Sequence, residues 1–337
     1  MATTALKASC LCKSAEHELT LPASCLPLPL TFCHCNSCRH YLGTLNLTTA
    51  VLPGSYKPSS DLISKLKVYD FFDRITDYFC PLCGTHMLFY VKHTNGYLNS
   101  PGYWAVHTGT LERADGVLDP DVHWFIGDTL DGGFADFLTS VEDKIIPRYA
   151  GFKGRTDELP LYWKSPEGTQ ITPSSSNKLH CYCKCRGVEF WIDKPDDGRK
   201  LHASLCACNS CRLDTGMEWT GWTSVPTVKV TLDVEGKVPF SVPFGTLKDY
   251  RSSHDVLRYH CDTCGATAFY QKYDKTDIVD VAIGLMDAPE GARAEDWLEW
   301  KTAGLDFRED ALPRARSLTL AVEYGLEEYS KRKLGAG

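Results

Sequence analysis

Apolar and polar residues alternate in short runs along most of the chain, with glycine, proline, asparagine and aspartate between the runs. Clear examples are Val188–Ile192 (VEFWI), Val225–Leu232 (VPTVKVTL) and Ile278–Ile283 (IVDVAI). Runs of this length that are rich in β-branched and aromatic residues, with a period of two, are typical of strands. The pattern therefore predicts a mainly β fold.

Helical periodicity occurs in two segments. Between Asp131 and Tyr149, the apolar residues spaced for one helix face are Phe134, Phe137, Leu138, Val141 and Ile145. Between Ser317 and Lys333, the residues expected to face inward are Leu320, Tyr324 and Leu326. Gly325 lowers the helix propensity of this second segment. We expect short helices of this kind to close each domain.

A linker divides the chain. Residues 155–178 contain three prolines and a run of three serines, a composition typical of a linker or surface strap. Leu161, Tyr162 and Trp163 within it are apolar, so part of the segment is expected to pack on a domain. The sequence thus predicts a first domain at 1–154 and a second at 179–337, each long enough for its own core.

Fourteen of the sixteen cysteines form one seven-cysteine pattern that occurs twice. The first copy comprises Cys10, Cys12, Cys33, Cys35, Cys38, Cys80 and Cys83, and the second comprises Cys183, Cys185, Cys206, Cys208, Cys211, Cys261 and Cys264. The first five pairs lie 173 residues apart (183 minus 10), and the last two lie 181 apart (261 minus 80). Five equal offsets indicate a tandem duplication. Cys25 and Cys181 fall outside the pattern and are expected to be unliganded.

Charge and hydropathy limit the function classes. The formal charge is −7 and the pI is about 5.9, which argues against a broad nucleic-acid or membrane-binding face. The sequence shows neither a signal peptide nor an apolar run of about 20 residues, so we expect a cytoplasmic protein. Disulfides rarely persist in a reducing compartment, and closely spaced cysteine pairs suit a shared metal ion. Metal binding is therefore the expected role of the cysteines.

Seven cysteines in each copy divide into four and three. A Cys-x-Cys pair and a later Cys-x-x-Cys-Gly pair could form a closed four-cysteine zinc site. These sites would be Cys10, Cys12, Cys80 and Cys83 in the first copy, and Cys183, Cys185, Cys261 and Cys264 in the second. Gly84 and Gly265 follow the last ligand, where a positive φ would turn backbone amides toward the sulfurs. We expect both sites to be structural.

The other three cysteines form a compact Cys-x-Cys-x-x-Cys cluster in each copy. The clusters are Cys33, Cys35 and Cys38, and Cys206, Cys208 and Cys211. Three protein ligands leave one corner of a zinc tetrahedron open, as in catalytic sites. Alternatively, His34 could close the first site, although its counterpart is Ala207. The spacing is not that of ferredoxin-type iron–sulfur clusters. The sequence thus predicts four zinc ions per chain.

These motifs resemble the glutathione-dependent formaldehyde-activating (Gfa) family, which includes centromere protein V. The matching segments of the first copy are CLC at 10–12, CHCNSCR at 33–39, CPLCG at 80–84 and GTL at 109–111; those of the second are CKC at 183–185, CACNSCR at 206–212 and CDTCG at 261–265. The resemblance implies coiled antiparallel sheets around a structural zinc (a β-tent) and a catalytic zinc on three cysteines. It also implies carbon–sulfur lyase-type chemistry, in which glutathione combines with formaldehyde.

The two copies differ around the three-cysteine clusters. His123 lies in a first-copy segment that resembles the family's late proline-then-histidine segment, and the second copy has no histidine there. His123 is therefore a candidate acid or base, or alternatively a strand-edge hydrogen-bonding residue. Arg39 and Arg212 follow the last cluster cysteine and could balance thiolate charge, bind a substrate carboxylate, or form ordinary surface pairs.

The leading interpretation is a zinc enzyme that acts on a glutathione–aldehyde adduct or a related thiol or carbonyl substrate. The candidate catalytic residues are Cys33, Cys35, Cys38, His123 and Arg39. The alternative is a non-catalytic zinc-stabilised scaffold that binds a protein partner. A small molecule is the expected partner, with glutathione as a candidate, and the sequence does not predict the oligomeric state.

Overall fold

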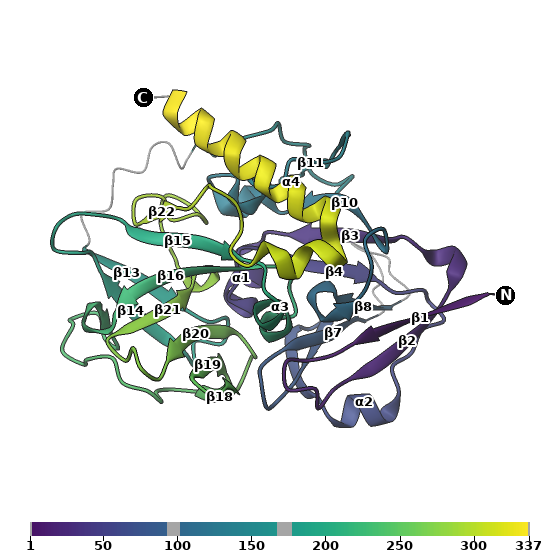
Figure 1. The fold of residues 1–337 in the computed structure, drawn as a ribbon, viewed down its shortest axis with the longest axis horizontal. Helices are drawn as coiled ribbons and strands as arrows, with labels where there is room; N and C mark the ends of the chain where they lie inside the picture. The colour runs from purple at the N-terminus through teal and green to yellow at the C-terminus, as the bar shows by residue number, and fades with distance from the viewer. Residues whose placement is uncertain (1, 93–101, 167–176, 336–337) are drawn as a thin grey trace.

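The computed structural model describes residues 2–92, 102–166 and 177–335 (Figure 1). The predicted mainly β fold is confirmed: two large sheets dominate the molecule, and helices lie between and over them. The first copy occupies one half of the molecule and the second copy the other half, as the colours of Figure 1 show.

The first copy forms a three-stranded and a seven-stranded sheet. Its strands are β1 (Thr3–Ala8), β2 (His17–Pro22), β3 (Leu28–Cys33), β4 (Leu47–Val51), β5 (Lys67–Phe72), β6 (Ile75–Phe79), β7 (His86–Val91), β8 (Tyr103–His107), β9 (Leu111–Glu112) and β10 (Leu118–Trp124). Its helices are η1 (Ala23–Cys25), α1 (Asn36–Leu42), α2 (Ser60–Ser64) and η2 (Thr108–Thr110). The sheet orders are β2-β1-β9 and β10-β3-β4-β8-β7-β6-β5.

The second copy repeats this arrangement. Its strands are β13 (Lys178–Tyr182), β14 (Glu189–Asp193), β15 (Leu201–Cys206), β16 (Thr220–Pro226), β17 (Val230–Thr231), β18 (Leu247–Ser253), β19 (Val256–Cys261), β20 (Thr267–Lys272), β21 (Ile278–Ala282) and β22 (Leu298–Trp300). Its helices are α3 (Asn209–Thr215), η6 (Thr227–Lys229), η7 (Ile283–Leu285) and α4 (Arg308–Gly335). The sheet orders are β13-β14-β17 and β18-β19-β20-β21-β16-β15-β22.

The two large sheets have the same topology. In each, one edge strand, β10 or β22, runs parallel to its neighbour, and the other pairings are antiparallel. The same register shift also recurs, between Tyr78 and Phe79 in β6 and between Tyr259 and His260 in β19. Each shift falls directly before the Cys-x-x-Cys turn. The duplication inferred from the cysteine register is therefore also a duplication of the fold.

Two predicted elements are wrong. The segment from Asp131 to Tyr149 is not one helix; it contains η4 (Gly133–Asp136), β11 (Ser140–Val141) and β12 (Lys144–Ile145), after η3 (Ile126–Thr129). Left-handed backbone at Gly132, Gly133 and Glu142 interrupts the helical path. The predicted strand Val225–Leu232 ends at Pro226, continues as η6 and resumes as β17.

The predicted C-terminal helix is confirmed, but its orientation differs. α4 is broken at Ala315, close to Pro313, and its buried face carries Leu318, Val322 and Leu326. Leu320 and Tyr324, expected to face inward, are 41% and 56% exposed. The apolar residues are spaced by four, which a helix brings onto one face.

α4 continues the second copy in sequence and packs on both copies, crossing the upper part of Figure 1. A Cβ at Gly325 would lie 2.2 Å from the Phe137 carbonyl oxygen, so the close approach requires glycine. The Ser317 amide donates to Asp115 of the first copy at 3.0 Å. Among the described residues, no helix is both long and apolar enough to span a membrane.

The linker also packs against α4. Tyr162 lies beneath the Arg332 guanidinium, with 3.5 Å between the guanidinium carbon and the ring centroid, as expected for a segment with apolar residues. The Ser165 amide donates to the Leu130 carbonyl at 2.7 Å. The serine run of the predicted linker lies outside the described residues.

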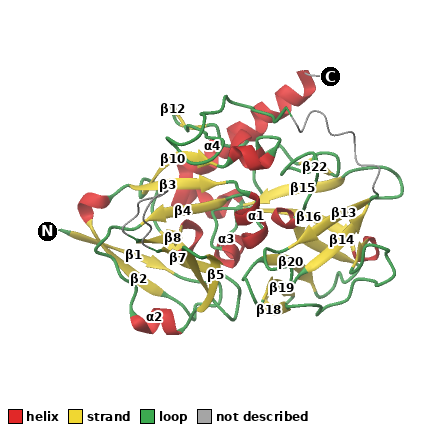
Figure 2. Cartoon of the chain, turned by 180° about the vertical axis from the view of Figure 1, so that it is seen from behind, coloured by secondary structure: helices red, strands yellow, loops and turns green. Residues whose placement is uncertain are grey.

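The two copies meet through α1 and α3, which lie at the centre of the molecule in Figures 1 and 2. Each helix ends at a left-handed glycine, Gly43 or Gly216. The Gly109 amide donates to the Gly216 carbonyl at 2.9 Å, and the Gly284 amide donates to the Gly43 carbonyl at 3.1 Å. The same contact therefore occurs twice in the interface, and each copy supplies the amide in one contact and the carbonyl in the other.

Replacing Gly216 with alanine should lower the free energy of unfolding by about 3 kcal/mol, because strain and overpacking add at this position. Its Cβ would lie 2.1 Å from the His86 carbonyl oxygen of the first copy. Gly198→Ala is the matched control, because Gly198 also has a positive φ (+71°) but has no atom within 4 Å of the place where a Cβ would lie. We expect the control to lose only about 1 kcal/mol in urea unfolding. Equal losses would contradict a tightly packed interface.

Candidate metal centres

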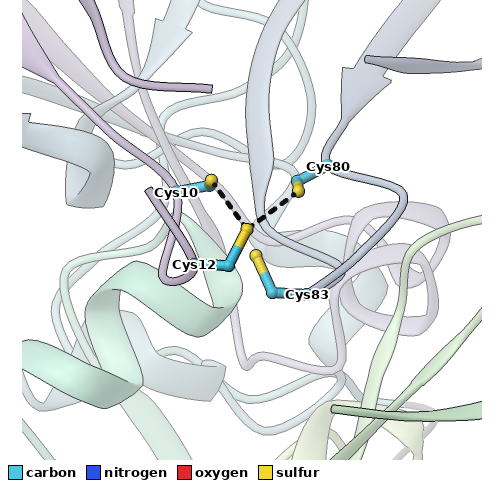
Figure 3. Close-up of side chains that lie close together, drawn as sticks. All are labelled: Cys10, Cys12, Cys80 and Cys83. Atoms are coloured by element: carbon cyan, nitrogen blue, oxygen red, sulfur yellow. Dashed lines mark hydrogen bonds between the residues drawn. The ribbon is translucent and has the colours of Figure 1, made fainter. Parts of the chain in front are cut away.

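The first four-cysteine site joins two turns of the first copy. Cys10 and Cys12 follow β1, and Cys80 and Cys83 lie between β6 and β7. Their sulfurs converge in Figure 3, with 3.4 Å between the Sγ atoms of Cys10 and Cys12 and 3.5 Å between those of Cys12 and Cys80. The site thus fixes the first strand of the small sheet to the hairpin of the large one.

The second four-cysteine site has the same construction. Cys183 and Cys185 follow β13, Cys261 ends β19, and Cys264 lies between β19 and β20. The Sγ atoms of Cys185 and Cys261 are 3.4 Å apart. Backbone amides of Gly187 and Val188 donate to the sulfurs of Cys185 and Cys183 at 3.4 and 3.3 Å.

Both sites have the donor set that zinc prefers. In each, the four sulfurs lie within 4.8 Å of one another, and most of the cysteines are buried. Gly84 and Gly265 adopt φ of +79° and +80°, as expected after the last ligand. Soft thiolates in such a cluster favour zinc over harder cations such as magnesium or calcium. These residues can therefore hold a closed, structural metal ion.

The three-cysteine clusters lie where a strand of the large sheet meets a central helix. Cys33 ends β3, Cys35 caps the N-terminus of α1 and Cys38 lies in its first turn. Cys206, Cys208 and Cys211 occupy the same places on β15 and α3. The Cys38 amide donates to the Cys35 sulfur at 3.3 Å, and the Cys211 amide to the Cys208 sulfur at 3.2 Å. The three sulfurs of each cluster lie within 4.8 Å of one another.

A carboxylate accepts a hydrogen bond from the first backbone amide of each central helix. Asp128 accepts from the Asn36 amide at 3.2 Å, and Asp310 accepts from the Asn209 amide at 2.9 Å. Asp310 lies in α4, far along the chain from the cluster cysteines, so spacing alone could not have indicated it. The two clusters therefore share their helix capping as well as their cysteines.

The candidate Arg39 is buried and reaches the other copy. Its guanidinium donates to the Met286 carbonyl at 3.5 Å and to Asn36 at 2.8 Å. Arg212 is buried in the same way, donating to the Gly109 carbonyl at 2.7 Å and to Glu112 at 2.8 Å. The idea of ordinary surface pairs is therefore wrong. Both arginines connect the two copies beside the clusters.

His123 is buried next to the first cluster and hydrogen-bonded at both ring nitrogens. Its Nδ1 lies 2.9 Å from His34 Nε2, and its Nε2 lies 2.8 Å from the Leu138 carbonyl oxygen. Burial, and then the nearby His34 and Arg148, hold the pKa of His123 well below its usual range. His34, the alternative zinc ligand, thus directs Nε2 at His123. A catalytic role of His123 stays a prediction.

A pocket of about 660 Å³ lies over the second three-cysteine cluster. All three cluster cysteines line it, together with the cationic side chains of Arg258 and Lys272 and the aromatic rings of Trp222 and Tyr270. The hairpin between β20 and β21 forms one side. The equivalent hairpin of the first copy includes residues 93–101, which lie outside the described part of the structure.

Arg258 is a site residue that sequence reasoning missed. Its two terminal nitrogens lie 3.7 and 3.6 Å from the Cys211 sulfur, and one of them lies 3.2 Å from Asp214. Hydrogen bonds with Cys206 and Cys208, and then the Arg258 guanidinium, hold the pKa of Cys211 well below its usual range. An arginine directly after two apolar residues of a strand (VLRYHC) was the signal available in the sequence.

The first cluster receives a cation from the other copy. Lys184 lies between two cysteines of the second four-cysteine site, and its ammonium donates to Ser37 of α1 at 2.9 Å. Hydrogen bonds with Cys33 and Cys38, and more weakly the Lys184 ammonium, hold the pKa of Cys35 well below its usual range. Each cluster thus has a positive charge beside its thiolates. Arg258 of the second copy supplies it for the second cluster, and Lys184 of the second copy supplies it for the first.

Comparison with protein families agrees with this geometry. The model of the glutathione-dependent formaldehyde-activating enzyme family matches residues 5–128 and 178–300, which together make up more than half of the chain. No curated protein matched. Each matched segment contains one complete set of seven cysteines. The chain therefore belongs to the glutathione-dependent formaldehyde-activating enzyme family and carries two copies of its domain in tandem.

Proposed function

We propose that this protein is a zinc-dependent enzyme that forms or cleaves the carbon–sulfur bond of a thiol–aldehyde adduct, with glutathione as the thiol. The strongest support is the pocket that reaches Cys206, Cys208 and Cys211 in a chain of this family. An open pocket beside three convergent thiolates is the arrangement expected of a catalytic rather than a structural metal centre. The cysteine-rich centres also suit a reducing compartment, so we propose a cytoplasmic location.

The proposed reaction is an addition without redox change. The thiol sulfur bonds to the carbonyl carbon, the S–H bond breaks, and the carbonyl oxygen takes up a proton; cleavage of the adduct reverses each change. When bound by the three cysteines, zinc would supply Lewis acidity and favour thiolate over thiol at neutral pH. The protein must then position the two reactants and balance the charge around the cluster.

Side chains of the pocket are suited to these tasks. Arg258 lies against both Cys211 and Asp214 and offsets part of their negative charge, so that less of this charge opposes the approach of a thiolate. Lys272 adds a second cation at the pocket wall, where a substrate carboxylate could bind. Trp222 and Tyr270 provide apolar surface against which a small organic substrate can be oriented.

The first centre is proposed to bind a second zinc ion of the same type on Cys33, Cys35 and Cys38. His123 is hydrogen-bonded to His34, the residue between Cys33 and Cys35 in the sequence, and so would act there as a positioning residue. Arg39 would hold α1 against the second copy. The sequence favours this centre because of His123, and the pocket supports a catalytic role of the second centre.

Exchange NMR on the zinc-loaded full chain tests the proposal. Because thiols add to formaldehyde rapidly without a catalyst, the measured quantity is the increase in exchange rate between free glutathione and its formaldehyde adduct with protein concentration. We expect a linear increase in wild type and in Cys25→Ser, a cysteine outside all four clusters. No acceleration with glutathione and a series of small aldehydes, together with cysteine-bound ions that all resist a chelator, would favour a zinc-stabilised scaffold instead.

A further inference from the structure

A buried carboxylate lies between two histidines in the large sheet of the first copy. Asp77 in β6 has Oδ1 at 3.0 Å from His86 Nδ1 in β7, and Oδ2 at 2.7 Å from His107 Nε2 in β8. Asp77 is 2% exposed and both histidines are fully buried. Three neighbouring strands thus direct one carboxylate and two imidazoles into the same enclosed space.

The ion-pair partners of Asp77 are confined to this cluster. Among the described residues, Asp77 forms ion-pair contacts only with these two histidines, and no lysine or arginine side chain pairs with it. An imidazole can donate a hydrogen bond to a carboxylate in its neutral form, in which it brings no positive charge. A carboxylate buried without a counter-charge is costly, so a cation is expected nearby.

In the second copy, a side chain of the protein balances the buried negative charge at the equivalent position. The residues equivalent to Asp77, His86 and His107 are Arg258, Thr267 and Ala282, from the 181-residue offset and from the strand pairing of Thr49 with His107 and of Trp222 with Ala282. There the buried carboxylate is Asp214, and the Arg258 guanidinium compensates it at 3.2 Å. The first copy has an aspartate in place of this arginine, together with two histidines.

The ligand atoms of the first-copy cluster suit a divalent transition metal. Two imidazole nitrogens and a carboxylate oxygen lie within 4.8 Å of one another, and this donor set is typical of zinc sites. The hydroxyl of Tyr41, in α1, is buried near Asp77 and could complete the shell. The Tyr41 ring packs edge to face against the His86 ring, with 4.5 Å between the two ring centroids.

We propose that Asp77, His86 and His107 bind a zinc-type divalent cation, which forms a fifth metal site, without cysteine, beside the four cysteine clusters. Its position indicates a structural role. The His86 carbonyl oxygen lies 2.1 Å from the place where a Cβ at Gly216 would be, and the His86 ring lies 2.9 Å from the place where a Cβ at Gly265 would be. An ion here would fasten β6, β7 and β8 together directly beneath the interface with the second copy.

Anomalous diffraction at the zinc edge, from crystals of the zinc-saturated full chain, locates every bound ion and does not depend on activity. We expect five peaks per chain, one of them between Asp77, His86 and His107. Four peaks, all within cysteine clusters, would overturn the proposal and leave a hydrogen-bonded Asp–His cluster. Because the wild-type chain is used, the result does not depend on a variant that folds.

Metal analysis of variants provides the second test. Asp77→Asn keeps the shape and the hydrogen-bonding capacity of the side chain but removes its charge, so the folded variant should bind one zinc ion fewer than wild type. In the cobalt-substituted protein, it should lose the visible bands of a nitrogen–oxygen site and keep the thiolate charge-transfer bands. Thr267→Ala, at the position equivalent to His86, is the matched control and should keep the full metal content. An unchanged metal content in folded Asp77→Asn would contradict the site.

Discussion

Cys80→Ser should abolish cooperative folding of the first copy. Cys80 is fully buried and contributes one of four sulfurs to a site that joins β1 to the β6–β7 hairpin. Structural zinc sites contribute roughly 10–16 kcal/mol in small zinc domains, which equals or exceeds the typical stability of about 5–15 kcal/mol of a whole domain. Loss of one thiolate should therefore be sufficient to unfold the copy. The measurement is urea unfolding followed by circular dichroism, with zinc content determined on the same sample.

The second copy should also be weakened by this substitution. Thr85, two residues after Cys83, lies 3.1 Å from the Cys83 sulfur and donates to the Leu213 carbonyl of α3 at 2.5 Å. A collapse of the first zinc site thus removes a contact that holds the helix of the second three-cysteine cluster. Cys25→Ser is the control, since Cys25 lies outside the clusters and should change stability by less than about 0.5 kcal/mol. A Cys80→Ser protein as stable as this control would mean that the four-cysteine site is not structural.

Cys208→Ser should reduce turnover of the thiol–aldehyde adduct by at least about 100-fold while the fold is kept. Substitution of residues that only support metal ligands reduces metal affinity or activity roughly 10–100-fold. Because Cys208 is itself a proposed ligand, we expect a loss of turnover at or beyond the upper end of this range. Cys208 lines the described pocket and is only partly buried, so its substitution leaves the core intact. The measurement is the exchange rate in the zinc-loaded protein, with circular dichroism and thermal unfolding as checks on the fold.

Cys35→Ser is the matched variant in the first copy, because Cys35 and Cys208 both cap a central helix with their sulfurs. If the second centre is the principal one, Cys35→Ser should keep most of the turnover. The opposite result, in which Cys35→Ser alone abolishes turnover, would assign catalysis to the first centre, which the sequence favours through His123. Equal partial losses would indicate that both centres are active.

The cysteine register was informative because metal-binding turns are local. Cys-x-Cys and Cys-x-x-Cys pairs place two sulfurs together whatever the rest of the chain does, and an offset of 173 residues shared by five cysteine pairs marks the copies. The seven cysteines of each copy could be divided into groups of four and three on one assumption. The early Cys-x-Cys pair and the late Cys-x-x-Cys pair had to lie together in the folded domain. The positive φ of Gly84 and Gly265 could be anticipated for the same reason, since a tight turn demands it.

Periodicity was less informative where glycines interrupt it. The apolar residues between Asp131 and Tyr149 have helical spacing, and Phe134, Phe137 and Leu138 are indeed buried. However, they reach the core from a 3₁₀ turn and a loop rather than from one helix face. Burial of apolar side chains was thus predicted correctly and the backbone was not, because tertiary packing decides between backbones that bury the same residues.

The sequence by itself determined the duplication, the mainly β class, the family and the four cysteine clusters, because each depends on residue types and on their spacings along the chain. Only the tertiary structure showed that Arg258 lies against Cys211, that Lys184 reaches the opposite cluster, and that Asp77 is enclosed by two histidines. Those placements result from strand register and from packing between the copies, and they involve residues far apart in the chain. Cysteine spacing thus identifies the metal centres, while the charges that distinguish one centre from another are set by contacts that no local pattern encodes.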